Sequence, residues 1–316
     1  SATDPTVFSS GMTGIIGENY SIRGFSSATS DVAFGGLFGV SPVYRTSPEM
    51  FERIEVLKGP SALLNGMPPG GSVGGSINLV PKRAAETPLA RVTASYMSDA
   101  QWGGHIDLGQ RFGENKQFGI RINGVYRDGD GAINHQEKKT RLASVGLDWR
   151  GAGARLSADL YSSEDRARGL NRGVNLAAGL PVPRPPKAET LLNPSWAFYD
   201  TKDKGAMLRG EYDVSEQLMA YAAIGAGKAD YQSTGAYLIQ VFNTAGDYRT
   251  NLADLGFKLE KQSAEAGVKG KFRTAGISHQ WAANATYYHH TDQQFGRRNT
   301  LAQDWITNIY HPVWGP

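Results

Sequence analysis

The sequence predicts a mainly β fold in which a small mixed α+β domain precedes a long antiparallel sheet. After residue 89, apolar and polar residues alternate through one segment after another, and turn residues separate these segments. Before residue 83 the pattern differs, with short apolar stretches between Gly- and Pro-rich turns. No apolar run among the 316 residues is long enough to cross a membrane as a helix, which excludes a helical membrane protein.

The stretch at 52–82 organises the first domain and reads ERIEVLKGPSALLNGMPPGGSVGGSINLVPK. The alternation at Ile54 and Val56 predicts a strand that ends in a Lys-Gly-Pro turn. A Gly- and Pro-rich loop follows, with room for one helical turn at 61–65, and residues 77–80 predict a second strand. The stretch is therefore expected to form a strand, a turn, a loop and a strand.

Glycine-rich loops also bind phosphate where they open a helix, which is the alternative interpretation of the same stretch. No helical pattern follows the glycines, and neither a Gly-Lys-Ser/Thr ending nor a GxGxxG spacing before a helix is present. Nucleotide binding is therefore not expected. The glycines supply the backbone freedom that tight turns need.

A second motif, Tyr-Ser-Ile-Arg-Gly-Phe, occupies residues 20–25. The two motifs, in this order and followed by a long β tract, resemble the plug domain of TonB-dependent outer-membrane receptors, particularly the ferric-siderophore branch. The resemblance implies a plug domain at 1–83, a linker at 84–88 and an antiparallel transmembrane β-barrel from 89 to 316. The change to a polar composition at 84–88 agrees with that boundary.

Nine barrel strands are predicted, at 89–97, 103–112, 118–127, 140–150, 154–164, 204–214, 218–230, 262–272 and 278–291. Because the family's barrels close with many more strands, we expect an N-terminal fragment that lacks the energy-coupling box and the remaining strands. An open sheet in lipid leaves backbone groups unpaired at several kcal/mol each, so the segment is not expected to be a working pore by itself.

The connections between these strands alternate in length. Those near residues 113, 151, 215 and 275 are tight, whereas those at 128–139, 165–203 and 231–261 are long, and only the first join breaks this pattern. Short turns at one rim and long loops at the other are typical of outer-membrane barrels. The resemblance implies that the tight turns are periplasmic and the long loops external.

The strand at 154–164 illustrates the expected orientation of side chains. Ala154, Leu156, Ala158 and Leu160 share one face, which we expect to contact lipid, while Ser157 and its odd-numbered neighbours face the lumen. Soluble sandwiches alternate in the same way, so periodicity alone does not distinguish the two classes.

Four charged residues of the motifs are the expected contacts between the plug and the barrel. By resemblance, Arg23 and Lys58 stand where the family places basic residues that pair with acids on the barrel wall, and Arg53 and Glu55 lie beside Lys58. Many members carry Arg in place of Lys58, and Lys lacks the bidentate fork of Arg. The alternative is that these are ordinary exposed charges, which contribute little.

Ligand contacts are expected, again by resemblance, from the plug's apices and from loop aromatics. The apex at 38–44 supplies Phe38 and Tyr44, and the loops supply Trp196, Tyr199 and Tyr237. Aromatic residues combine a large apolar area with a polar handle and suit such a site. The alternative is that some of these rings belong to the aromatic girdles of a membrane barrel.

Several functional classes are not expected from the composition. A net charge of +3 is too small to indicate nucleic-acid binding, and the absence of Cys removes thiol nucleophiles and zinc ribbons. His289 and His290 are adjacent, so on a strand they point to opposite faces and do not converge on one metal ion. No nucleophile elbow is present, and an enzyme is not expected.

The leading hypothesis is therefore an outer-membrane receptor of a Gram-negative bacterium for energy-coupled uptake of a ferric siderophore. By resemblance, its partners are the ferric siderophore, the TonB complex of the inner membrane and outer-membrane lipid. The siderophore carries the iron, so no cofactor or protein-bound metal is expected, and the chain is expected to be a monomer. The alternatives are a receptor for haem, cobalamin or another chelate, and a soluble all-β carbohydrate-binding or adhesive domain.

Overall fold

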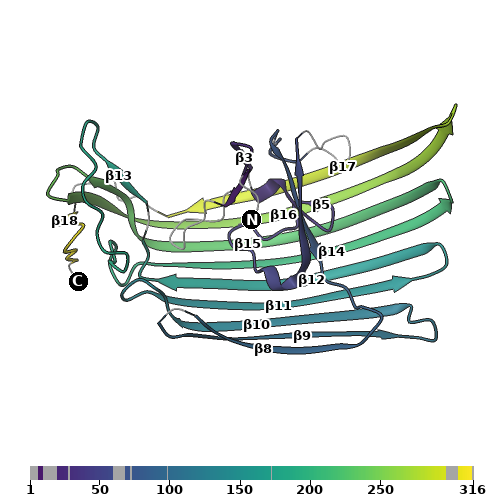
Figure 1. The fold of residues 1–316 in the computed structure, drawn as a ribbon, viewed down its shortest axis with the longest axis horizontal. Helices are drawn as coiled ribbons and strands as arrows, with labels where there is room; N and C mark the ends of the chain where they lie inside the picture. Colours follow the sequence, from purple (N-terminus) through teal and green to yellow (C-terminus); the bar gives the residue numbers. More distant parts are fainter. Residues whose placement is uncertain are drawn as a thin grey trace.

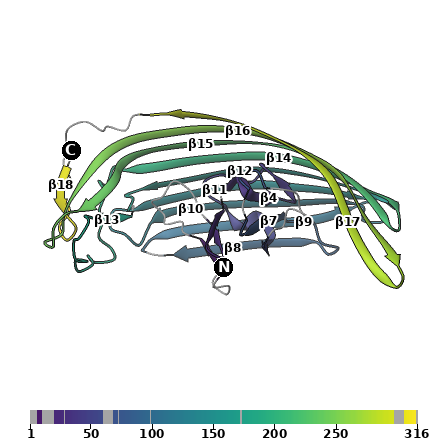
Figure 2. The ribbon, with the colours of Figure 1, turned by 90° about the horizontal axis from the view of Figure 1, so that it is seen from above.

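The structure, a computed structural model, consists of a long curved antiparallel sheet with a small plug on its concave side (Figures 1 and 2). It describes residues 6–9, 20–27, 29–59, 68–71, 73–97, 99–171, 173–296 and 305–314, without the side chains of 236–238. The regular structure is almost entirely strand, which confirms the predicted fold class. Within these ranges, no helix has the length and apolar composition needed to cross a membrane.

In its described residues the plug has two small sheets and two short 3-10 turns. The first sheet joins β1 (Val7–Ser9), β2 (Tyr20–Ile22) and β3 (Phe25–Ser27), and the second has the order β5-β4-β7-β6. Its strands are β4 (Val32–Phe34), β5 (Leu37–Phe38), β6 (Phe51–Lys58) and β7 (Gly75–Pro81), with turns η1 (Thr29–Asp31) and η2 (Pro48–Met50). The antiparallel pair β6 and β7 confirms the two strands predicted in 52–82. The helical turn predicted at 61–65 lies outside the described residues.

The plug and the large sheet share one hydrophobic core. Phe34, Leu37 and Leu79 of the plug are almost completely buried, and they pack in the same cluster as Tyr161 and Met207 of the large sheet. The ring of Phe34 stacks on the ring of Tyr161 at a centroid distance of 5.5 Å. The plug therefore packs as an integral layer against the concave face.

The large sheet is a meander with two short additional strands. Its nine consecutive strands run in the order β17-β16-β15-β14-β12-β11-β10-β9-β8, while β13 pairs with β15 and β18 pairs with β16. Their bounds are β8 (Leu89–Met97), β9 (Gln101–Phe112), β10 (Phe118–Asp130), β11 (Glu137–Arg150), β12 (Ala154–Arg168), β13 (Val174–Leu176), β14 (Phe198–Ser215), β15 (Leu218–Val241), β16 (Asp247–Thr274), β17 (Ile277–Phe295) and β18 (Trp305–Asn308). In the described part of the chain the sheet does not close into a cylinder, and β8 and β17 are its edges.

All nine predicted strands are present and the tight turns are confirmed, but the predicted loop at 231–261 is wrong. β15 continues to Val241 and β16 begins at Asp247, so only residues 242–246 connect them. Residues 169–197 form a long connection between β12 and β14. This connection and the one at 242–246 lie at the end of the sheet opposite the tight turns (Figure 1). The strands are longer than predicted because polar residues on both faces hide the alternation, while the pairing of β15 with β16 continues through them.

The convex face of the sheet carries an uninterrupted apolar band. The pairing register of β10, β11, β12, β14 and β15 aligns three successive rows without a charged side chain. These rows are Phe118-Trp149-Leu156-Gly210-Ala222, Ile120-Leu147-Ala158-Leu208-Ile224 and Ile122-Val145-Leu160-Ala206-Ala226. A charged region begins two residues beyond the third row, on the side of the long connections, where Lys204 pairs with Lys228. Such a band, bounded by charge, is the pattern of a surface that faces lipid.

We expect Leu156→Arg to cost about 2–4 kcal/mol of unfolding free energy in a bilayer, the range for a cation on the lipid face near the midplane. Leu156 is 50% exposed on the convex face, as predicted for the even-numbered residues of β12. Ser157→Arg is the matched control, because Ser157 faces the lumen side and should tolerate the change. Guanidinium titration in lipid vesicles measures both, and equal losses would show that neither face of β12 contacts lipid.

Candidate functional site

The residues that follow β7 attach the plug to the large sheet, which we call the wall. Lys82 Nζ lies 2.8 Å from Asp107 Oδ2, and the same carboxylate accepts two hydrogen bonds from Arg121. Arg83 forms a two-pronged ion pair with Asp159, in which Nη2 donates to Oδ2 at 2.6 Å. Both aspartates are buried, so each depends on its basic partners for compensation of its charge.

The four charged residues predicted as plug–barrel contacts take no part in these ion pairs, and their contact with the barrel stays a prediction. These two pair with each other at 2.7 Å on the exposed surface of β6. Hydrogen bonds from Asn78 and then Arg53 lower the pKa of Glu55. Arg23 occupies the turn between β2 and β3 with a φ of 53° and an exposed side chain, and Lys58 is exposed at the end of β6.

The apex predicted at 38–44 is pressed against the wall instead of rising freely into the lumen. Phe38 is 2% exposed and Val40 is fully buried, and β5 contacts β15 and β16. Phe38 is therefore buried between the plug core and the sheet, and its contact with a ligand stays a prediction. Tyr44 is half-buried, and burial together with the charge of Asp203 raises its pKa well above the usual value, so its hydroxyl stays protonated.

Tyr44 and Arg45 lie against two tyrosine rings of the wall, Tyr231 and Tyr199, which we call the aromatic ledge. The ring of Tyr44 lies 5.0 Å from that of Tyr231, and the guanidinium of Arg45 lies 5.3 Å from the ring centroid of Tyr199. Tyr199 is itself 1% exposed and donates a hydrogen bond to Asp165 at 2.6 Å. Tyr199, predicted to contact the ligand, is therefore covered and packs against Arg45. The accessible surface at this point belongs to Tyr44 and Arg45, which are both partly exposed.

Of the other two predicted loop aromatics, Trp196 lies outside this group and the side chain of Tyr237 is not described. Trp196 is 42% exposed at the end of the long connection, just before β14. Tyr237 lies in β15, where the register shifts between Ala236 and Leu238, and its side chain is outside the described atoms. Ligand contact by Trp196 and Tyr237 stays a prediction.

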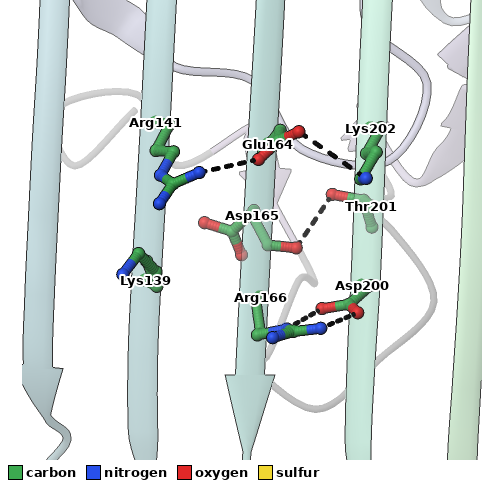
Figure 3. Close-up of a pocket in the computed structure, with 8 residues that line it drawn as sticks. All are labelled: Lys139, Arg141, Glu164, Asp165, Arg166, Asp200, Thr201 and Lys202. Carbon is green, nitrogen blue, oxygen red and sulfur yellow. Dashed lines mark hydrogen bonds and ion pairs between the residues drawn. The ribbon is translucent and has the colours of Figure 1, made fainter.

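A recess of about 340 Å³ on the wall is lined mainly by charged residues, among them Asp165, the partner of Tyr199 (Figure 3). Arg141, Glu164 and Lys202 form a chain of ion pairs across β11, β12 and β14, at 3.6 and 3.7 Å. By register these residues continue the rows of the convex face beyond the apolar band. These three ion-paired residues therefore face outward and are not part of the concave site.

His289 and His290 lie next to each other in β17 and so face opposite sides of the sheet, as their spacing predicts. His290 lies opposite Lys261 of β16, and its ring is 5.5 Å from that of Tyr288. Among the described residues, no group of three or more His, Cys, Asp or Glu side chains is placed to hold a metal ion.

Sequence reasoning did not single out Lys82, Arg83 or Arg45, nor the aspartates of the wall that pair with Lys82 and Arg83. One signal was present: Asp107 and Asp159 occupy lumen-facing positions of strands whose alternate residues are apolar. A charge at such a position requires a partner from whatever covers that face. The pattern indicates a need for pairing, but it does not identify the partner.

A plug held by buried ion pairs against the concave face of a long sheet, whose convex face is apolar, is the arrangement of a plug domain on part of the wall of a membrane β-barrel. Residues 2–75 match the TonB-dependent receptor plug domain, and the chain belongs to the TonB-dependent receptors. It is similar to the ferrichrome receptor FcuA of Yersinia enterocolitica, with 38% identity over 301 residues that cover 93% of this chain and 38% of FcuA.

Two solved structures extend the comparison. BauA, the ferric preacinetobactin receptor from Acinetobacter baumannii, superposes with a TM-score of 0.95 at 56% identity and covers 99% of this chain. The pyoverdine outer membrane receptor FpvA from Pseudomonas aeruginosa superposes with a TM-score of 0.81 at 15% identity over 98% of the chain, which shows a shared fold. The chain spans 47% of BauA and 46% of FpvA, so it corresponds to about half of each.

Proposed function

We propose that the protein is an outer-membrane receptor that imports a ferric siderophore and that its plug gates the passage. The observation that carries the proposal is the plug seated on the concave face of a sheet with an apolar convex band, together with 56% identity to a ferric preacinetobactin receptor. The apolar band suits contact with outer-membrane lipid and disfavours the alternative of a soluble carbohydrate-binding module. The chain acts as a monomer in this proposal.

The ligand is a ferric chelate in which the siderophore supplies all the iron ligands. The protein contributes binding contacts and no catalytic step, in keeping with relatives that are named as receptors. The exposed parts of Tyr44 and Arg45 offer an aromatic face, a hydroxyl and a cation, which suit a chelate with aromatic or anionic groups. Energy for release comes from the TonB complex acting on the plug.

Iron-limited growth and direct binding test the function. A strain that lacks the gene should lose growth on one ferric siderophore and regain it with the gene on a plasmid. Purified full-length protein in detergent should bind that chelate, with ferrichrome and ferric preacinetobactin as the first candidates. Binding of haem or cobalamin with no binding of any ferric siderophore would favour the alternative ligand class.

We expect Tyr44→Ala and Arg45→Ala each to weaken binding of the ferric chelate by about 1–3 kcal/mol, the range for loss of a buried aromatic or cation–π contact. Tyr96→Ala is the matched control, because Tyr96 is 54% exposed on β8, far along the chain from the ledge, and packs against Trp102. Fluorescence titration gives the affinities. Unchanged binding in both variants would move the site to the loop that contains Trp196.

A further inference from the structure

The plug segment between β5 and η2 is held through its main chain by three side chains of the wall. Tyr161 Oη donates to the carbonyl of Val40 at 2.5 Å, and Lys261 Nζ donates to the carbonyl of Ser41 at 2.6 Å. Asp203 Oδ1 accepts a hydrogen bond from the amide of Val43 at 2.8 Å. Three strands, β12, β14 and β16, thus hold three of the four residues at 40–43.

The wall has glycines at the positions where this segment passes. Gly205 and Gly227 lie in one row between Tyr161 and Lys261. A Cβ at Gly205 would overlap the ring of Tyr161, and a Cβ at Gly225 would lie 2.5 Å from Val40 Cγ2. Neither Gly205 nor Gly225 has a positive φ, so backbone conformation does not explain them. The ring of Tyr161 in the wall packs on Gly205, and Val40 of the plug packs on Gly225. We call Tyr161, Asp203, Lys261 and these glycines the loop seat.

The charges of the loop seat are unusual for a purely structural contact. Asp203 and Lys261 are 2% and 5% exposed, and burial of ionised groups requires compensation by hydrogen bonds and nearby charge. Asp203 and Lys261 each obtain one of these compensating hydrogen bonds from the main chain of the plug. The position of the loop and the stability of these two side chains therefore depend on each other.

The segment that the loop seat holds, residues 40–43, lies directly before the two residues proposed to contact the ligand. Tyr44 and Arg45 follow Val43 in the chain, and their ring and charge rest on the neighbouring wall residues Tyr231 and Tyr199. We propose that Asp203 and Lys261 are positioning residues for ligand recognition, which fix residues 40–43 so that Tyr44 and Arg45 present a preformed surface. The proposal rests on the proposed function, because it concerns the same site. Preorganisation of this kind raises affinity by reducing the ordering cost of binding.

Thermodynamic linkage gives the proposal a second consequence. If a held loop favours ligand binding, a bound ligand must favour the held loop by the same factor. A chelate on Tyr44 and Arg45 should therefore slow the opening of the hydrogen bond between Val43 and Asp203.

Hydrogen exchange and ligand titration of the full-length protein in detergent test this. We expect Lys261→Met to speed amide exchange in residues 40–43 and to lower the affinity for the ferric siderophore about tenfold, within the usual range of coupling between sites. Gly225→Ala keeps both charges and pushes the loop away by contact with Val40, so it should change exchange and affinity in the same direction. Bound ligand should slow exchange in the parent more than in either variant.

Arg155→Met is the matched control. Arg155 is a cation on the lumen face of β12, but it pairs with Glu211 and Asp213 near the tight turns. Parent-like exchange and affinity in both Lys261→Met and Gly225→Ala would overturn the proposal, as would an equal loss of affinity in Arg155→Met. If the parent binds no ferric chelate, the proposed function fails and the positioning role falls with it. Exchange in 40–43 then still shows separately whether the loop seat holds the plug.

Discussion

Asp107→Ala is expected to lower the unfolding free energy by about 3–5 kcal/mol, the cost of leaving buried charges without their partner. Asp107 is 1% exposed, and it compensates Arg121 of the wall and Lys82 of the plug at once. Its loss leaves the Arg121 guanidinium buried, since Arg121 itself is 7% exposed. The effect should therefore exceed that of any single ion pair on the surface.

Denaturant titration of the full-length protein measures this loss, and Asp213→Ala is the matched control. Asp213 also pairs with an arginine, Arg155, but its side chain is 41% exposed, so water screens the pair and the loss should be much smaller. Lys82→Ala leaves Asp107 paired with Arg121 and should fall between the two. Similar losses for Asp107→Ala and Asp213→Ala would mean that water screens the anchor of the plug.

Phe34→Ala is expected to cost about 3–5 kcal/mol, the usual range for loss of a buried phenylalanine. Phe34 is 3% exposed, with its ring 5.7 Å from Phe51 in the plug and 5.5 Å from Tyr161 in the wall. The cavity would thus open in the core that joins the two layers. Protease accessibility of the plug should rise in this variant.

Phe25→Ala provides the comparison, because Phe25 is in the same domain but 53% exposed on β3. Its removal should change stability by less than about 1 kcal/mol. If the plug of the Phe34→Ala variant resists protease as the parent does, the ion pairs at Lys82 and Arg83 hold the plug without help from the shared core.

The sequence determined the features that depend on neighbouring residues. Alternation from Ala154 to Leu160 predicted which face of β12 is apolar, and the convex exposure of Leu156 and Leu160 agrees with that prediction. The tight turns and the paired strands β6 and β7 were also predictable, because turn residues and short apolar alternations act locally. The two plug motifs, which lie in order along the chain, were specific enough to indicate the family.

Strand ends in the polar part of the sheet were not predictable in the same way. Residues 231–261 alternate poorly because neither face there is uniformly apolar, yet β15 and β16 pair almost throughout this region. Their hydrogen-bond ladder and the packing of buried residues such as Tyr231 and Leu255 extend the strands. Pairing across strands, which a single sequence does not display, decided these boundaries.

The contacts of the plug were decided by tertiary structure alone. Val43 and Asp203 are 160 residues apart, and Ser41 and Lys261 are 220 apart, so no local pattern joins them. Alternation indicates which face a side chain occupies, but not which element covers that face. For this reason Phe38, expected at an exposed apex, is buried. Lys82 and Arg83 hold the plug because their side chains reach the buried aspartates of the wall at the point where the chain leaves the plug.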